Sequence, residues 1–300
     1  NARIFDVIHI HALFSFNTLV AAWSARLAGV PYILRPLGTM SHYGVTQRRP
    51  WLKRASLAVF EGPALRHAAA VHFTSEDEQR EAAQWAVRMR GVVIPLGIEP
   101  AQRADGALVR AQYPALGAAP YLLFLSRLDP KKNIEGLLQA FVLILPNRPG
   151  LRLLVAGDGA PAYAASLQAM AVELGLGNSV VWAGRVDGDL KASALGGAEL
   201  FVLPSFSENF GIAAAEALMA GLPCVLGQGV AISGDVVNAG AGLAVTPDPA
   251  SIAAGLMQVL ADESARDAMG SAALRLAQER YSAKAMGANL VALYSEILKR

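Results

Sequence analysis

Cysteine is almost absent from this chain. The 300 residues contain one cysteine, Cys224, so no disulfide can form within the chain. Cys224 lies in the apolar stretch Pro223–Leu226, a setting typical of a buried and inert thiol in a reducing compartment. The scarcity of cysteine excludes a fold stapled by disulfides, and it favours a cytoplasmic location.

Charge and long hydrophobic runs are also scarce. Charged residues make up 17% of the chain and its net charge is +2, which gives no support to binding of nucleic acid. No apolar run approaches the length of about 18 residues that a membrane-spanning helix needs, and no secretory signal pattern is present. Hydrophobic residues make up 54%, which is ample for packed cores, and the length indicates roughly two domains.

Several common site motifs are missing. The sequence has no metal-binding spacing of cysteine and histidine, no P-loop and no G-x-S-x-G. The turn Gly157–Gly159 matches a relaxed dinucleotide motif, but Asp187 comes too late to be its acidic partner, so we favour a plain turn. Asp187 and Asp189 have the spacing of a metal-holding carboxylate pair, and here we favour a solvated turn. We therefore expect neither a bound cofactor nor a required metal.

Apolar strand-like runs alternate with helical stretches along the chain, which predicts an α/β fold with parallel sheets. The expected strands are Val7–Ile10, Pro31–Leu34, Ala70–Phe73, Val92–Pro95, Tyr121–Leu125, Leu151–Val155, Val180–Ala183, Leu200–Leu203, Cys224–Leu226 and Leu243–Val245. We predict two Rossmann-like domains that face a cleft. A partial first domain covers residues 1–100, a linker rich in glycine and proline covers 101–118, and a second domain covers 119–283. A helix at about 284–300 could pack back on the first domain.

Two glutamates bracket the stretch from Glu208 to Glu216. A buried strand ends just before it, and a helix is expected from Ile212 to Ala220, with Gly221 as its stop. The free backbone N–H groups at such a helix start favour an anion. Carboxylates accept hydrogen bonds from sugar hydroxyls, so the combination suggests a nucleotide-sugar. The alternative is that both glutamates are solvated residues beside a helix.

A second loop carries two cations, Arg127 and Lys132, between the strand Tyr121–Leu125 and a helix from Ile134. Asn133 is expected to cap that helix. Open α/β sheets bind ligands at the carboxyl ends of their strands, and Arg with Lys suits a diphosphate. The alternative is that both cations are solvated. It is less favoured because the Glu208 to Glu216 stretch independently predicts a ligand site at the same edge of the sheet.

These motifs occur in an order that resembles the retaining, GT-B-fold glycosyltransferases of family 4. The resemblance covers essentially the whole chain and is strongest in residues 120–245. The segments that carry it are Ser126-Arg127-Leu128 through Lys132, Gly157-Asp158-Gly159, Val181-Trp182-Ala183-Gly184-Arg185-Val186, Leu203-Pro204-Ser205, Glu208 to Glu216, and Ala220-Gly221-Leu222-Pro223.

The resemblance implies roles for these residues. Arg127 and Lys132 would hold the donor diphosphate and carry the catalysis. Glu208 would contact the donor sugar and Glu216 the ribose hydroxyls. The binding residues would also include Asn209, the backbone of Phe210, Gly211 and Ile212, and Gly184 with Arg185 near the base.

The front of the chain resembles the family less completely. Asp6–His11 matches a segment of the family's first domain, and His11 is a candidate substrate contact. A strand-end histidine is as often packed and hydrogen-bonded. The family's glycine-rich loop does not precede Asn1, so we expect a truncated first domain. Many members carry a functional histidine after the strand that corresponds to Pro31–Leu34. This chain has Arg35 at that place, and we assign no catalytic histidine there.

The resulting hypothesis is a retaining transfer of a sugar from a nucleoside diphosphate-sugar to a saccharide or lipid-linked acceptor in polysaccharide or glycoconjugate synthesis. The alternatives are a sugar-nucleotide epimerase of similar fold and a non-catalytic fragment that binds sugar nucleotides. Peripheral contact with the inner face of a membrane could involve a basic segment with an aromatic residue; the alternative is a solvated helix face. The residues of this segment are Arg48, Arg49, Trp51, Lys53 and Arg54.

Overall fold

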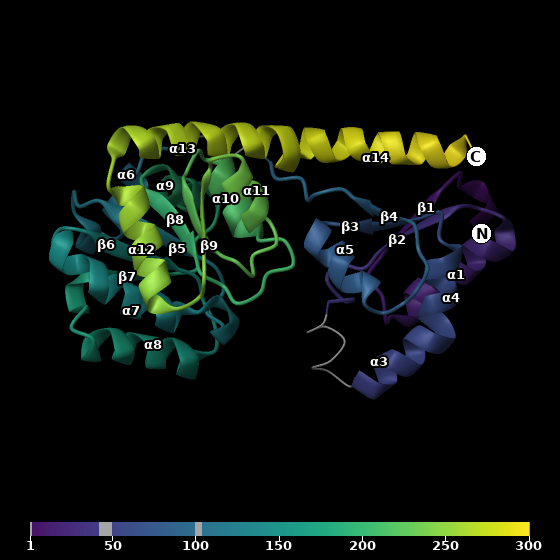
Figure 1. The fold of residues 1–300 in the computed structure, drawn as a ribbon, viewed down its shortest axis with the longest axis horizontal. Coiled ribbons are helices and arrows are strands. Elements are labelled where there is room, and N and C mark those ends of the chain that lie inside the picture. Colours follow the sequence, from purple (N-terminus) through teal and green to yellow (C-terminus); the bar gives the residue numbers. More distant parts are fainter. Residues whose placement is uncertain (1, 42–49, 100–103, 300) are drawn as a thin grey trace. The chain divides into compact units, whose positions relative to one another are not determined.

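The computed structural model describes residues 2–41, 50–99 and 104–299. The chain forms two compact units, each described by itself (Figure 1). Unit 1 comprises residues 1–97 and 283–300, and unit 2 comprises residues 98–282. Each unit is built on a parallel β-sheet.

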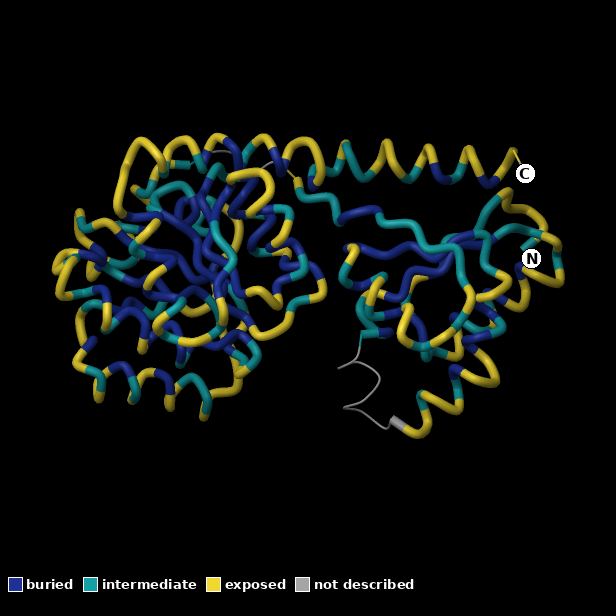
Figure 2. The backbone as a smooth tube through the Cα atoms, viewed as in Figure 1, coloured by how far each residue is buried: buried dark blue, intermediate teal, exposed yellow. Residues whose placement is uncertain are grey.

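Unit 1 contains a parallel sheet of four strands in the order β1-β2-β3-β4. The strands are β1 (Ile8–His11), β2 (Tyr32–Arg35), β3 (Ala70–Phe73) and β4 (Gly91–Val93). All residues of β2 and β3 are buried, as expected for a parallel sheet covered on both faces; Figure 2 shows these inner strands in dark blue.

Side chains of β2 alternate between the two faces of this sheet. Tyr32 and Leu34 join a cluster that includes Ala25 of one covering helix and Leu65 of another, whereas Ile33 packs against the C-terminal helix. The helical elements of unit 1 are η1 (Ala2–Ile4), α1 (Phe16–Ala28), α3 (Pro50–Ser56), η2 (Leu57–Glu61), α4 (Gly62–His67), α5 (Glu76–Ala83) and α14 (Ala283–Leu298).

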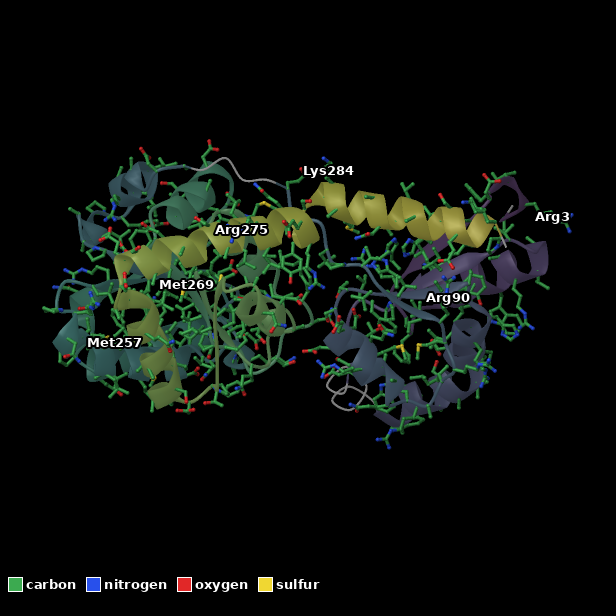
Figure 3. All side chains as sticks on the ribbon, turned by 45° about the horizontal axis from the view of Figure 1, so that its top comes forward. Arg3, Arg90, Met257, Met269, Arg275 and Lys284 are labelled. Atoms are coloured by element: carbon green, nitrogen blue, oxygen red, sulfur yellow. The ribbon has the colours of Figure 1, made fainter. Side chains whose placement is uncertain are left out.

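The C-terminal helix α14 is an integral part of unit 1. Its residues Leu293 and Ile297 are buried against the sheet. An ion pair of 2.6 Å joins Glu296 to Arg90, which is labelled beneath α14 in Figure 3. Unit 1 is therefore closed by a segment that lies almost 200 residues after its last strand in the sequence, between 93 and 283.

Unit 2 contains a parallel sheet of six strands in the order β10-β9-β8-β5-β6-β7. The strands are β5 (Tyr121–Leu125), β6 (Arg152–Ala156), β7 (Val180–Gly184), β8 (Leu200–Leu203), β9 (Cys224–Gly227) and β10 (Gly242–Val245). The chain runs outward from β5 to β7 and then returns to place β8 on the other side of β5. This reversal is the switch point at which open α/β sheets bind ligands.

Helices cover both faces of the six-stranded sheet. In Figure 1, α7 and α8 lie below this sheet, and α9, α10 and α11 lie above it, the arrangement that right-handed crossovers produce when the winding direction reverses. The helical elements of unit 2 are α6 (Ala107–Gln112), η3 (Pro114–Leu116), η4 (Pro130–Lys132), α7 (Ile134–Ile144), η5 (Leu145–Asn147), α8 (Pro161–Glu173), η6 (Gly177–Ser179), α9 (Gly188–Gly196), α10 (Ile212–Met219), α11 (Ser233–Asn238), α12 (Pro249–Leu260), α13 (Glu263–Leu276) and η7 (Ala277–Tyr281).

The structure places a strand at each predicted strand, and the α/β class with parallel sheets is confirmed. The linker expected at 101–118 is corrected: α6 and η3 lie in this stretch and belong to unit 2. The physical reason is burial, because Val109 is fully buried and its backbone N–H donates to Ser193 Oγ of α9 at 3.0 Å. The frequency of glycine and proline therefore wrongly predicted a linker where the chain forms a packed segment.

Candidate functional site

The loops that follow β5 and β8 lie next to each other, because these strands are neighbours in the sheet. Phe206 N donates to Lys131 O at 2.9 Å, which ties the two loops together. Asn133 adds a second link, since its Nδ2 donates to Pro204 O at 3.2 Å and to Pro247 O at 2.7 Å. The two loops identified in the sequence thus form one structure at the carboxyl edge of the sheet.

The role predicted for Asn133 as a side-chain cap is wrong. Asn133 adopts the left-handed conformation at φ 56° and its side chain accepts no hydrogen bond from α7. Asn tolerates this conformation better than most residues, and its amide instead links the ends of three loops. A side-chain cap occurs one element earlier, where Asp129 Oδ1 accepts from Lys131 N at 3.0 Å at the start of η4.

The Gly157–Gly159 turn supports the loop after β5. Leu128 N donates to Asp158 O at 2.7 Å and Ser126 N donates to Ala156 O at 3.1 Å, so the two loops extend the pairing of β5 and β6. A Cβ atom at Gly157 would overlap Ser126 O, and one at Gly159 would overlap Leu128 O. The glycines are thus explained by close backbone approach.

The two candidate cations of the β5 loop, Arg127 and Lys132, have different surroundings. Arg127 is exposed and forms no ion pair among the residues described. Lys132 is only 8% exposed, and its Nζ forms an ion pair with Glu208 Oε1. Burial lowers the pKa of the half-buried Lys131, an effect that Asp129 and Glu208 oppose and that Lys132 and Arg127 reinforce. The loop therefore presents the exposed guanidinium of Arg127, while its two lysines are partly buried beside carboxylates.

Backbone pairing fixes Glu208 in place. Glu208 N donates to Gly229 O at 2.9 Å, and Glu208 O accepts from Ala231 N at 3.2 Å. Ser205 Oγ lies 3.3 Å from Glu208 Oε1. The loop after β9 thus supports the loop after β8, and it holds the carboxylate against Lys132.

The residues after Glu208 lead into α10. Asn209 is exposed. Phe210 is 3% exposed and packs edge-on against Tyr281, with ring centroids 5.5 Å apart, so its side chain anchors the turn. Gly211 has φ 96°, a conformation that favours glycine. Ile212 is 53% exposed at the helix start.

Glu216, inside α10, forms an ion pair of 2.8 Å with Lys191 of α9. Lys191 was not predicted from the sequence. No local pattern joins a lysine and a glutamate 25 residues apart, and only the packing of the two helices brings them together.

Gly184 ends β7 and Arg185 follows it. Gly184 O accepts from Gly157 N at 2.6 Å, so this strand end adjoins the turn after β6. Arg185 is exposed, and its Nε lies 3.6 Å from the exposed Asp187. Such an exposed pair contributes little to stability, and it leaves the guanidinium in contact with solvent.

His11 belongs to unit 1, where it ends β1 and is exposed. Its ring stacks on that of His9, with centroids 4.7 Å apart. Burial lowers the pKa of His11, and nearby Arg35 lowers it further. His11 therefore tends to be neutral near pH 7.

The basic segment considered for membrane contact lies partly outside the described residues, which exclude Arg48 and Arg49. Trp51 is 70% exposed on α3, and Lys53 lies over the Phe14 ring at 5.4 Å. A cavity of about 690 Å³ opens beside this helix, and it is lined by Phe14, Leu52, Lys53, Ala55, Ser56, Val59 and Phe60. Arg54 is exposed. Apolar and basic side chains thus share one surface.

Neither a metal-binding cluster nor a membrane-spanning helix occurs among the described residues. No three His, Cys, Asp or Glu side chains gather there as a metal site would require. No helix there has both the length and the apolar character needed to cross a membrane.

Comparison with known proteins identifies the family. The profile described as "Glycosyl transferases group 1" matches residues 108–275, and one described as "Glycosyl transferase 4-like domain" matches residues 1–97. The first match covers more than half of the chain. The chain belongs to the glycosyl transferases of group 1.

Curated relatives agree with this assignment. An uncharacterised glycosyltransferase of Methanocaldococcus jannaschii is 35% identical over 162 residues, which are 54% of this chain and 41% of that protein. A phosphatidyl-myo-inositol mannosyltransferase of Mycobacterium tuberculosis is 28% identical over 305 residues. The match covers 98% of this chain and 74% of that protein. The chain spans about half the length of the first curated relatives, 41% and 51%.

Solved structures share the fold. Sucrose-phosphate synthase of Thermosynechococcus elongatus superposes with a TM-score of 0.80 at 24% identity, covering 98% of this chain and 74% of that one. Anabaena HepE in complex with UDP and glucose gives a TM-score of 0.79 at 21% identity, with 98% and 78% covered. The two parallel-sheet α/β domains are those of the GT-B glycosyltransferases.

Proposed function

We propose that this protein transfers a sugar from a nucleoside diphosphate-sugar to a saccharide or lipid-linked acceptor, with retention at the anomeric carbon. The observation that carries the proposal is the clustering, at the β5/β8 switch point, of exposed Arg127, the Lys132–Glu208 pair and the start of α10. A diphosphate needs cations and backbone N–H donors, and sugar hydroxyls need carboxylate acceptors. This edge of unit 2 offers all three.

In the proposed reaction, the bond from the anomeric carbon to the diphosphate oxygen breaks as the bond to the acceptor oxygen forms. Negative charge then accumulates on the diphosphate, where Arg127, Lys132 and the start of α10 stabilise it. The acceptor approaches the same face of the sugar, and a phosphate oxygen takes its proton. The protein supplies no nucleophile in this scheme, and we propose that it needs no bound metal.

The roles of the glutamates follow from their partners. Glu208 accepts a hydrogen bond from a donor-sugar hydroxyl while its ion pair with Lys132 holds the carboxylate in place. Glu216 accepts from the ribose hydroxyls while Lys191 orients it. The backbone from Asn209 to Ile212 meets the phosphates or the sugar, and Gly184 with Arg185 lies on the side of the base.

Calorimetric titration with UDP-, GDP- and ADP-sugars tests the donor assignment. We expect one of them to bind, and we expect Glu216→Ala to weaken that binding about tenfold or more, the loss of a charged hydrogen bond. Binding of none of the three, or binding unaltered by Glu216→Ala, contradicts the proposal. Product analysis distinguishes transfer with retention from epimerisation, which would release a rearranged sugar nucleotide.

We also propose a cytoplasmic location with peripheral contact to the inner face of a membrane. The exposed aromatic and apolar side chains of α3 and η2, together with Lys53 and Arg54, support this contact. Apolar insertion and attraction to anionic lipids act together at such surfaces. A lipid-linked acceptor would be encountered there.

A further inference from the structure

A row of basic side chains crosses the sheet of unit 1 at its carboxyl edge. The parallel register pairs His11 of β1 with Arg35 of β2. The next pairing, Leu34 with Val71, brings Arg35 beside His72 of β3. Partners in register point to the same face of a sheet. This is the face covered by α14, because Ile33 and Ala70, two residues earlier, pack against Leu293 and Ile297.

Arg35 lies at the centre of this row, and two of its guanidinium nitrogens have no partner among the residues that the structure describes. It is 7% exposed, and within the described residues neither its Nε nor its Nη2 has a hydrogen-bond partner. Glu78 is the acid whose charge acts on Arg35, but its oxygens are already engaged. Oε1 accepts from Gly38 N at 2.5 Å, and Oε2 accepts from Thr74 N at 2.7 Å and from Thr74 Oγ1 at 2.8 Å.

A buried cation with unmade hydrogen bonds is costly to the fold. Such a group in a folded protein calls for an explanation, and a ligand is one of the few available. Arg35 therefore differs from a structural arginine, which would be paired. Its fork of donors suits a phosphate or a carboxylate.

Two of the neighbouring histidines are committed to the fold. Since Ile94 O can only accept, His72 Nε2 donates to it at 2.8 Å, which leaves His72 Nδ1 to accept from His9 Nε2 at 3.3 Å. His9 Nδ1 then accepts from the Tyr294 hydroxyl at 2.8 Å. With both rings neutral, the state that their lowered pKa values favour, this series of hydrogen bonds assigns both tautomers.

His11 is the histidine that remains available. It is exposed, stacked on His9, and within the described residues it makes no hydrogen bond. A neutral imidazole still offers one N–H donor. Arg35 and His11 together can thus contact two oxygens of one anion.

The loops at this edge are also unusual. Ala12 (φ 72°), Phe14 (φ 58°) and Leu37 (φ 54°) adopt left-handed conformations although none is glycine. Ala12 N donates to Arg35 O at 2.8 Å, which ties the two loops together. Strain of this kind gathers at functional sites, and the carboxyl edge of a parallel sheet is where ligands bind.

We propose that Arg35 and His11 bind an oxyanion, a phosphate or carboxylate carried by the acceptor, so that the acceptor is an anionic molecule. The inference rests on the proposed transferase function for the identity of the ligand. The oxyanion site itself rests on Arg35 and its neighbours alone. The donor diphosphate is the competing source of an anion, and the experiment separates the two.

The test compares the full chain with Arg35→Met and His11→Gln, using inorganic phosphate at constant ionic strength as the probe. We expect phosphate at ten times its Kd to raise the Tm of the wild type by about 3 °C and to leave that of Arg35→Met unchanged. His11→Gln is expected to weaken the response. Arg35→Met without phosphate is expected to be at least as stable as the wild type, since it removes an unpaired buried charge. A clear loss of stability would indicate a structural arginine.

Two control variants complete the experiment. Arg90→Gln removes another cation of unit 1, one paired with Glu296, and should respond to phosphate like the wild type. Arg127→Ala should keep the phosphate response but lose affinity for nucleoside diphosphate. A response abolished by Arg127→Ala and retained by Arg35→Met overturns the inference, as does weakened UDP, GDP or ADP binding in Arg35→Met.

Failure of the inference and failure of the proposed function are distinguishable. If a nucleotide-sugar binds and phosphate acts without Arg35, the inference alone is overturned. If phosphate acts through Arg35 and no nucleotide-sugar binds, the anion site is supported but its assignment to an acceptor is overturned.

Discussion

At the scale of single residues, the candidate site combines one exposed cation with one that is already paired. Arg127 lies in solvent and keeps its charge available for a ligand. Lys132 and Glu208 neutralise each other in a half-closed setting, with side chains 10% and 17% exposed. In the proposed reaction, the donor must therefore bind to this ion pair rather than to an unpaired Lys132. Substitution of Arg127 should therefore affect ligand binding alone, whereas substitution of Lys132 should affect both ligand binding and the stability of the fold.

Arg127→Ala is expected to change the free energy of unfolding by less than about 0.5 kcal/mol, as surface substitutions usually do. Its affinity for nucleoside diphosphate should fall about tenfold or more, since a charged hydrogen bond is lost. Denaturant unfolding and calorimetry measure the two effects. Equal affinity in the variant would remove Arg127 from the site.

Lys132→Met is expected to weaken binding as well, but at a cost in stability of about 3 kcal/mol, because Glu208 loses its buried partner. The double variant Lys132→Met/Glu208→Leu removes both charges and should recover much of this stability. If the single variant unfolds at the wild-type denaturant concentration, the ion pair does not hold the loops together.

At the scale of elements, the sequence located the strands well. Continuous buried runs such as Tyr121–Leu125 and Leu200–Leu203 have the same bounds in the structure, because a strand buried on both faces must be apolar throughout. Helix type is less evident from the sequence. The helical segment after the basic stretch divides into α3 and a π-helical segment, η2, and tertiary packing rather than local propensity decides this division.

The turn after β6 is an element whose geometry depends on glycine. Gly157→Ala should destabilise unit 2 by about 2 kcal/mol or more, because the backbone has φ 150° and the new Cβ would overlap Ser126 O. Gly177→Ala is the matched control, since nothing lies within 4 Å of a Cβ there. Thermal unfolding of both variants measures the difference, and equal Tm values would contradict the close-approach explanation.

The joint between α14 and the sheet of unit 1 should be sensitive to acid. Burial, the largest cause, lowers the pKa of His9 to about 3 and that of His72 to about 4. The unfolded chain, with a histidine pKa near 6.5, then binds more protons than the folded one below that pH. Stability from these residues is therefore complete above about pH 6.5 and falls as the pH drops toward 4.

Urea unfolding at pH 7 and pH 5 checks this expectation. The midpoint should be lower at pH 5, and His72→Phe should reduce the difference between the two pH values. His67→Gln is the control, because His67 lies at an exposed position of α4 and, among the described residues, its ring bonds to Pro63 O alone. If the urea midpoint of His72→Phe changes between the two pH values as much as that of the wild type, the bonded histidines are not the cause of the acid sensitivity.

At the scale of the whole molecule, the two units divide the proposed chemistry. Unit 2 carries the donor-site candidates. Unit 1 carries the Arg35 row and, on α3 and η2, the surface proposed for membrane contact. Trp51 at 70%, Val59 at 59% and Phe60 at 48% are exposed there. From this surface we predict how the full protein binds to membranes.

The full protein is expected to bind vesicles that contain anionic lipid and to bind neutral vesicles less well, with salt weakening the interaction. Trp51→Glu should reduce binding by removing an apolar contact and adding a repulsive charge. Val172→Glu is the matched control, since Val172 is also 70% exposed but lies on α8 of unit 2. Flotation assays measure the effect, and equal losses in both variants would exclude a specific surface.

The sequence by itself determined the α/β class, the position of every strand, and the loops that carry Arg127 and the Glu208 to Glu216 stretch, because periodicity and strand ends are local properties. Only the tertiary structure decided that β8 returns beside β5, that Lys132 meets Glu208 and Lys191 meets Glu216, and that the buried Arg35 has no partner for its Nε and Nη2 within the described part of the chain. Strand order depends on helix packing and crossover direction over the whole sheet. Side-chain partners depend in turn on that order, and no local pattern encodes either.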